Sequence, residues 1–163
     1  MQMDQLRNLI LATENPLSVR HAARIAVIVV GSFFVAELLR LPEAYWAAIT
    51  TLVVVQSSAT AMPNAAQYFA GTAVGAAVGG WAGTYFPGSV LVFGTCVFAI
   101  GILFAPFQVE RSAYRYAVIT LAIVMLPLSH DGWTVALHRF LEVSVGLAVG
   151  LAVTAVWPEE HAK

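Results

Sequence analysis

The sequence predicts an all-α protein that crosses a membrane six times. Of its 163 residues, 60% are hydrophobic and 10% are charged, whereas a soluble domain usually carries about 25% charged residues. The interval from Ala44 to Val109 contains no Asp, Glu, Lys, Arg or His. This interval is too long for one membrane span, which takes about 20 residues, so it must hold several.

Six apolar segments account for most of the chain, and prolines lie near the ends of most of them. The expected helices are residues 21–39, 44–58, 64–86, 88–107, 112–128 and 133–157. Six spans of about 20 residues leave no room for a soluble domain. We therefore expect an N-terminal segment at 1–19, a six-helix membrane domain at 20–158 and a short cytoplasmic tail at 159–163.

The N-terminal segment has the pattern of an amphipathic helix lying in the membrane interface. Four apolar residues between positions 3 and 10 share one helical face, and Asn15-Pro16 ends the pattern. A frayed tail is the alternative. We expect no signal peptide, because the first apolar run follows a polar segment and has no small-residue cleavage site after it.

The basic residues orient the chain with both termini in the cytoplasm. In this orientation Arg40 is the only Lys or Arg residue in the outer segments. The cytoplasmic segments contain Arg7, Arg20, Arg24, Arg111, Arg115 and Lys163. This distribution follows the positive-inside rule. We interpret Arg115 as an interface anchor whose side chain reaches toward the cytoplasm.

The two halves of the chain resemble each other. Residues 67–79 and 138–150 share Phe, Val, Gly, Ala, Val and Gly in register, and residues 45–52 and 114–121 share Tyr, Ala, Thr and Leu. Each half holds three expected spans, and three is an odd number, so the second copy must be inverted in the membrane. An inverted 3+3 repeat places a substrate site near the bilayer midplane, where the copies meet.

Glycines repeat at every fourth position of the third segment and form one ridge of a helix. The ridge, called the glycine ladder below, consists of Gly71, Gly75, Gly79 and Gly83. In the sixth segment the equivalent row holds Gly146 and Gly150. Glycines allow membrane helices to approach closely. We expect packing between the third and sixth helices or between subunits, and favour it over a pore-lining role.

Three ionisable residues, His138, Arg139 and Glu142, lie inside the last apolar segment. A charge at membrane depth costs at least about 2.5–3.5 kcal/mol, so this cluster must face protein or water rather than lipid. Arg139 and Glu142 form either a permanent buried pair or an anion site in which a carboxylate replaces Glu142 on the guanidinium. We favour the anion site, with His138 and Glu142 as the candidate proton carriers. The sequence provides no third ligand for a metal at His138 and Glu142.

Other polar residues in the apolar segments are weaker candidates for substrate contact. Thr50, Gln56 and Thr72 are assigned to substrate binding, with helix–helix hydrogen bonding as the alternative. Cys96 is the only cysteine, so it forms no internal disulfide, and we interpret it as an apolar filler. The net charge of −1, without a basic patch, argues against nucleic acid binding. The sequence lacks a nucleophile elbow and a phosphate-binding loop, so we expect neither an enzyme nor a cofactor.

Three stretches together resemble the fusaric acid resistance protein-like family. They are YWAAITTLVVVQSS (45–58), GTAVGAAVGG (71–80) and RFLEVSVGLAVGLAVTAVWP (139–158). The family includes aromatic acid exporters of bacterial inner membranes, and the membrane part of plant aluminium-activated malate transporters is similar to it. The resemblance covers about residues 20–158. It implies efflux of small organic anions, in particular aromatic or amphipathic carboxylic acids, across a bacterial inner membrane.

The chain departs from many members of this family in two respects. Tyr68 occupies the position three residues before Gly71-Thr72 at which many relatives carry an arginine, which questions a shared anion-binding mechanism. Many relatives also have a cytosolic domain or a second six-helix half, so we expect this chain to work as a homo-oligomer. An anion channel of the malate-transporter type and a non-transporting assembly subunit are the alternative functions.

Overall fold

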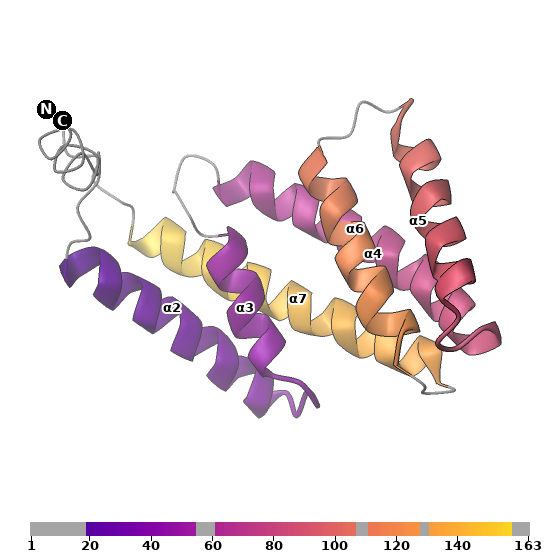
Figure 1. Cartoon of the computed structure of the whole chain (residues 1–163). Helices are drawn as coiled ribbons and strands as arrows, with labels where there is room; N and C mark the ends of the chain where they lie inside the picture. The colour runs from indigo at the N-terminus through magenta and orange to yellow at the C-terminus, as the bar shows by residue number, and fades with distance from the viewer. Residues whose placement is uncertain (1–18, 55–60, 107–110, 128–130, 158–163) are drawn as a thin grey trace, which may run out of the picture.

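The computed structural model describes residues 19–54, 61–106, 111–127 and 131–157, which fold into six α-helices (Figure 1). The helices are α2 (Val19–Leu38), α3 (Tyr45–Val54), α4 (Ala61–Tyr85), α5 (Val90–Phe104), α6 (Arg111–Met125) and α7 (Gly132–Val156). Each coincides with one predicted segment, and the described residues contain no strand, so the all-α prediction is confirmed. The predicted amphipathic helix at the N-terminus lies outside these residues.

Helix α7 is the element on which the fold is organised. It packs against α2, α3, α4 and α6. Helix α5 lies at the periphery, where it contacts α4 and α6, and Figure 1 shows it at the opposite end of the molecule from α2. The residues around α7 are therefore the ones that can surround its charged side chains.

The glycine ladder of α4 lies against α6. A Cβ atom added to Gly71 or Gly75 would overlap the carbonyl oxygen of Ala113 or Ala117, respectively. At Gly79 and Gly83 the nearest atoms to an added Cβ belong to Val124, at 3.1 and 3.2 Å. The ladder thus packs within one chain, and its tightest contacts are with the fifth expected helix, α6. The expected packing of the third helix on the sixth is also present, through Gly80, whose added Cβ would lie 3.0 Å from Trp133 of α7.

Helix α7 approaches α3 just as closely. A Cβ atom at Gly146 would overlap the carbonyl oxygen of Ala47. The hydroxyl of Thr51 lies 2.8 Å from that carbonyl and 3.0 Å from the carbonyl of Gly146, so it can donate to either. Gly150 is also buried on α7.

The two close contacts correspond to each other across the predicted halves. The third helix of the first half, α4, packs on the second helix of the second half, α6. Conversely, α7 packs on α3, and Gly75 and Gly146 take equivalent places in the two contacts. Exchanging the halves would exchange these contacts, although the inverted repeat itself remains a prediction.

Two described helices have the length and hydropathy required to cross a membrane, residues His21–Leu38 of α2 and Gly132–Val156 of α7. Helices α3 and α5 are apolar but shorter, with 10 and 15 described residues. A span of 30 Å needs about 20 helical residues. Six membrane crossings therefore remain a prediction from the sequence.

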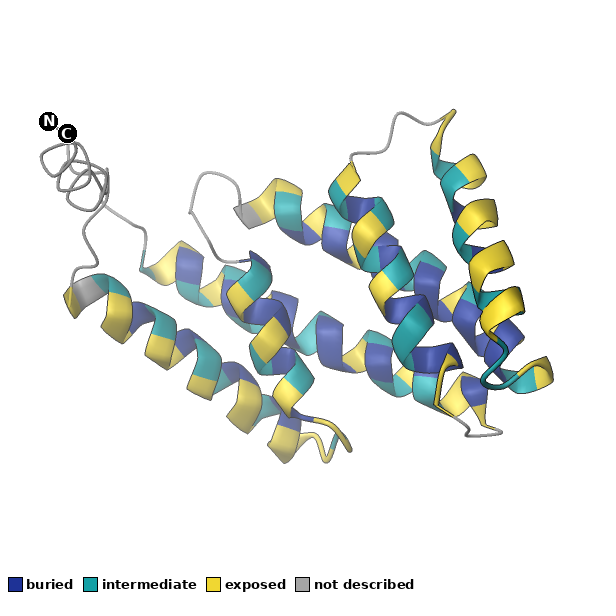
Figure 2. Ribbon diagram, in the orientation of Figure 1, coloured by how far each residue is buried: buried dark blue, intermediate teal, exposed yellow. Residues whose placement is uncertain are grey.

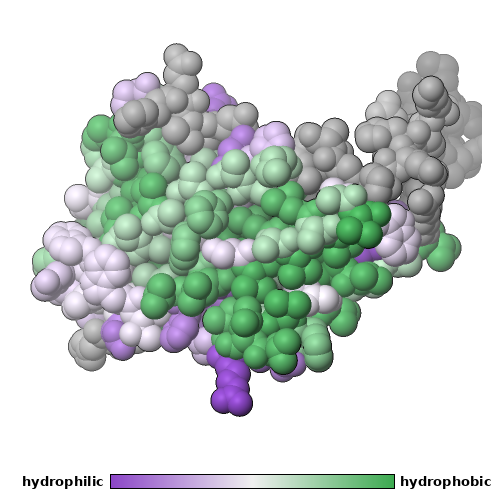
Figure 3. Space-filling view, turned by 180° about the vertical axis from the view of Figure 1, so that it is seen from behind, coloured by the Kyte–Doolittle hydropathy of each residue, from purple (hydrophilic) through white to green (hydrophobic). Residues whose placement is uncertain are grey.

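Apolar side chains cover much of the outside of the molecule. Helix α5 leaves most of its outer face uncovered (Figure 2), including Leu91 at 86% and Phe98 at 70% exposure. Figure 3 shows a broad hydrophobic surface on the face seen from behind. Several polar side chains are instead buried, namely Arg24, Ser32, Thr50, Thr51, Thr72, Thr120, Arg139, Glu142 and Thr154. An apolar exterior around buried polar groups is what a lipid environment favours.

Candidate functional site

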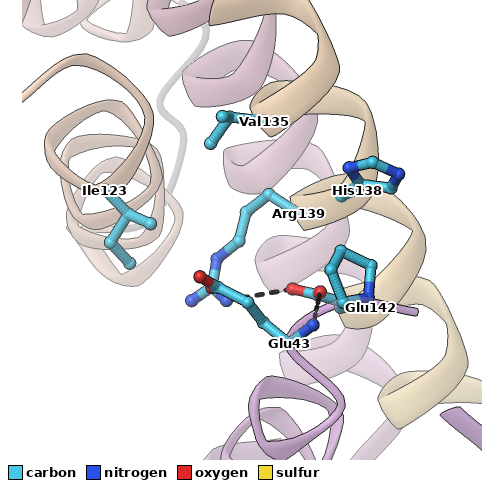
Figure 4. A pocket seen from close by; sticks show the side chains of 7 residues that line it. Glu43, Ile123, Val135, His138, Arg139 and Glu142 are labelled. Carbon is cyan, nitrogen blue, oxygen red and sulfur yellow. Dashed lines mark hydrogen bonds and ion pairs between the residues drawn. The ribbon is translucent and has the colours of Figure 1, made fainter. Parts of the chain in front are cut away.

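A buried ion pair on α7 forms the centre of the site. Nη1 of Arg139 lies 3.3 Å from Oε2 of Glu142, and the two side chains are 3% and 1% exposed (Figure 4). Residues three apart on a helix project from the same side, which brings the two groups together. Arg139 lies about 10 Å along the axis from Gly132, the first residue of α7.

Glu43, in the connection between α2 and α3, holds the carboxylate of this pair. Its backbone N–H donates to Oε1 of Glu142 at 3.0 Å, as the dashed line in Figure 4 shows. The carboxylate of Glu43 accepts a hydrogen bond from Nε1 of Trp46 at 2.8 Å. Both oxygens of Glu142 are thus occupied, one by the guanidinium and one by the backbone of a residue 99 positions away.

The ring of Trp46 covers the guanidinium of Arg139. The Cζ atom of Arg139 lies 3.3 Å from the centroid of the ring, a cation–π contact of about 0.5–2 kcal/mol. Trp46 follows Glu43 by three residues, and the turn that leads into α3, closed by a bond from the Trp46 N–H to the Glu43 carbonyl, brings the two side chains together. The sequence predicts interface aromatics here, and it does not predict this contact.

A pocket of about 250 Å³ opens beside the pair. It is lined by Pro42, Glu43, Ile123, Val135, His138, Arg139 and Glu142. Ile123 of α6 and Val135 of α7 supply apolar walls opposite the charged groups (Figure 4). Drug-sized ligands occupy pockets of about 300–1,000 Å³, so this pocket suits a smaller molecule.

One donor of the guanidinium is buried without a partner. Nε of Arg139 has no hydrogen-bond partner among the described residues, while Nη1 is engaged with Glu142. A buried N–H without an acceptor is unfavourable, and the planar guanidinium presents its donors in a fork that matches a carboxylate. The site therefore has unused capacity for an anionic group.

The structure places the other predicted substrate residues differently. His138 lines the pocket, but its ring points away from the guanidinium (Figure 4). Thr50 and Thr72 are fully buried, and their hydroxyls have no hydrogen-bond partner in the described part of the chain. Neither lines the pocket. Gln56 lies outside the described residues.

A second arginine, which the sequence assigns to the cytoplasmic end, is also buried. Arg24 of α2 is 2% exposed, and its Nη2 lies 3.3 Å from the hydroxyl of Thr154 on α7. Thr154 follows Arg139 by 15 residues, which corresponds to about 22 Å along a helix. The two buried guanidiniums therefore lie at separate levels of α7.

Comparisons with known proteins agree with the resemblance seen in the sequence. The sequence model of the fusaric acid resistance protein-like family matches residues 24–153. The chain is also 28% identical over 146 residues to the inner membrane protein YccS of Escherichia coli (strain K12). That alignment covers 86% of this chain and 20% of the relative, so the chain spans about a fifth of its length. No solved structure matches the chain.

The family match includes every residue that lines the pocket and both close helix contacts. It extends over most of the described chain, from α2 through most of α7. The chain is therefore a membrane protein that belongs to the fusaric acid resistance protein-like family.

Proposed function

We propose that this protein is the membrane unit of a transporter that exports small organic anions across a bacterial inner membrane. Aromatic or amphipathic carboxylic acids are the proposed substrates. The observation that carries the proposal is a buried arginine with an unpartnered Nε beside a pocket that has apolar walls.

The two features of the pocket select for the two parts of such a substrate. Arg139 supplies the charge and the donors that a carboxylate requires, and Ile123 and Val135 supply a surface for an apolar group. A pocket of about 250 Å³ favours a small molecule. A buried arginine also neutralises an anion at a depth where water cannot.

We further propose that the chain crosses the membrane six times, with both termini in the cytoplasm, and that two or more copies form the working unit. The crossed contacts of α4 with α6 and α7 with α3 support an inverted repeat. The exposed apolar face of α5 is available to lipid or to another copy. Cross-linking in native membranes tests the assembly, and recovery of monomer alone would contradict it.

The competing explanation is a permanent ion pair that only holds the helices together. Removing one partner of a buried pair costs about 3–5 kcal/mol, whereas replacing both with apolar residues is often neutral. The double substitution Arg139→Leu with Glu142→Leu therefore separates the two explanations. If the pair is structural, the double variant still transports, and if it is the anion site, the variant folds but does not transport.

Substitution of Arg139 by lysine is the finer test, because it retains the charge and removes the fork of donors. We expect the affinity of purified protein for labelled benzoate to fall about 10–100-fold, equivalent to about 1.5–3 kcal/mol. Arg115→Lys is the matched control, because Arg115 is exposed on α6 and does not line the pocket. Equal affinities for the Arg139→Lys and Arg115→Lys proteins would rule out Arg139 as the anion-binding residue.

A further inference from the structure

We infer that Glu142 takes up one proton when a substrate carboxylate replaces it on Arg139, so that each anion binds together with a proton. This inference rests on the proposed function and specifies the ion to which binding is coupled. It follows from the charges that surround Glu142.

The buried carboxylate is paired with one cation. Nη1 of Arg139 lies 3.3 Å from Oε2 of Glu142, and the carboxylate of Glu43 is a nearby like charge. Helix α6 contributes an apolar residue, Ile123, to the pocket. Tyr68 of α4 does not line the pocket but interacts electrostatically with Arg139. From the start of α3, Tyr45 faces Glu43. His138 is the remaining titratable residue of the pocket.

The replacement of one carboxylate by another leaves a charge without a partner. Glu142 is 1% exposed in this structure and lies close to the Glu43 carboxylate. Once a substrate occupies the guanidinium, the charge of Glu142 is no longer neutralised. Burial and a neighbouring like charge both favour the protonated form of a carboxylic acid. A hydronium ion or a buffer acid then gives up its proton to the displaced Glu142 carboxylate, so that the donor's bond to the proton breaks and one O–H bond of a neutral acid forms.

The local hydrogen bonds suit this neutral form. The carbonyl oxygen of protonated Glu142 can still accept the bond from the backbone N–H of Glu43. The carboxylate of Glu43 is exposed to solvent and is fixed next to the site by Trp46. It therefore provides an acceptor through which a proton can travel between water and the buried Glu142.

This coupling determines what drives transport. An anion and a proton that cross together carry no net charge, so the membrane potential does no work on their transport. The direction of net transport is then set by the concentration gradients of the acid and of protons taken together. A site that carried the anion alone would instead respond directly to the membrane potential.

Calorimetry of benzoate binding tests the inference with the full-length protein. The titrations start at about pH 7 from the substrate-free protein, in which Glu142 is paired with Arg139, and benzoate is ionised at this pH. They are run in two buffers that differ in ionisation enthalpy. The difference in apparent binding enthalpy gives the number of protons taken up. We expect about one proton per benzoate for the natural protein and none for Glu142→Gln, which retains an acceptor for the Glu43 N–H.

The variant His138→Asn identifies the proton carrier. It should still take up about one proton per benzoate, because Glu142 remains, and loss of uptake in this variant would overturn the assignment to Glu142. Binding of benzoate to the natural protein without proton uptake would overturn the coupling and leave the anion site intact, even if Glu142→Gln fails to fold. A lack of any benzoate binding would refute the proposed function and the coupling together.

Discussion

At the scale of single residues, Trp46 and Glu43 define the charged site as much as the ion pair does. Trp46 contacts Arg139 through its ring face and Glu43 through its indole N–H. Glu43 contacts Glu142 through its backbone N–H. Four residues from two parts of the chain therefore form one connected set of contacts, in which a change in any member affects the others.

Trp46→Leu should destabilise the protein by about 1–3 kcal/mol, because it removes both the cation–π contact and a hydrogen bond to a charged group. Trp46→Phe retains a ring face for Arg139 and should lose less. The thermal unfolding of protein purified in detergent measures both effects. Trp81→Phe is the control, since Trp81 is 51% exposed on α4. Equal unfolding temperatures for Trp46→Leu and the natural protein would show that the contact contributes nothing to stability.

The sequence was sufficient to identify two of these four residues as a site. Arg139 and Glu142 are conspicuous because ionisable residues rarely occur within an apolar segment. Glu43 contributes a backbone N–H, which every non-proline residue possesses, so its identity carries no signal for that bond. Trp46 has the expected position of an interface aromatic, and only its place above Arg139 distinguishes it from one.

At the scale of helices, the fold depends on contacts in which backbone meets backbone. Gly75 of α4 lies against the backbone of Ala117, and Gly146 of α7 lies against that of Ala47. The glycine ladder could be predicted to lie in a close contact, because small residues permit one. The helix that packs on the ladder could not be predicted, because a glycine indicates that a neighbour approaches closely but not which helix that neighbour belongs to.

A methyl group added at Gly75 should separate α4 from α6. We expect Gly75→Ala to lower stability by about 1–3 kcal/mol, because the added Cβ overlaps the Ala117 carbonyl and the helices must shift. Gly94→Ala on α5 is the matched control, since nothing lies within 4 Å of its added Cβ. Gly94→Ala should be neutral or stabilising by up to about 1 kcal/mol, because alanine is the better helix former. Thermal unfolding of the two variants side by side gives the comparison, and equal stability would exclude a tight α4–α6 contact.

At the scale of the whole molecule, the apolar segments were enough to predict every described helix, since each helix falls within or close to one apolar run. The packing order was not predictable in the same way. Helix α5 precedes α6 directly in sequence, yet the contacts of α6 that require glycine are made with α4. Hydropathy specifies which residues avoid water, and it does not specify which apolar surfaces meet.

The predicted topology can be tested with cysteines introduced at Ser129 and Ala162, both outside the described residues. In a Cys96→Ser background, we expect a membrane-impermeant reagent to label the first from outside intact cells and the second only after the membrane is opened. The reason is that the basic residues retain both termini in the cytoplasm. Labelling of both positions from the same side would show that residues 133–157 do not cross the membrane, which would contradict the predicted topology and the inverted repeat.

The contacts between α3 and α7 also have a mechanical consequence. They join the start and the middle of α3 to α7: the N–H of Glu43, two residues before α3, donates to Glu142, and the hydroxyl of Thr51 on α3 can donate to the carbonyl of Gly146. Hydrogen bonds at two positions along adjoining helices oppose both translation and rotation of one helix against the other, so α3 and α7 should move as one rigid body. No side-chain hydrogen bond joins α6 to α7 among the described residues. Spin labels on α3 and α7 should therefore keep a constant separation when substrate binds, while the distance from α7 to α6, which carries Ile123, should increase.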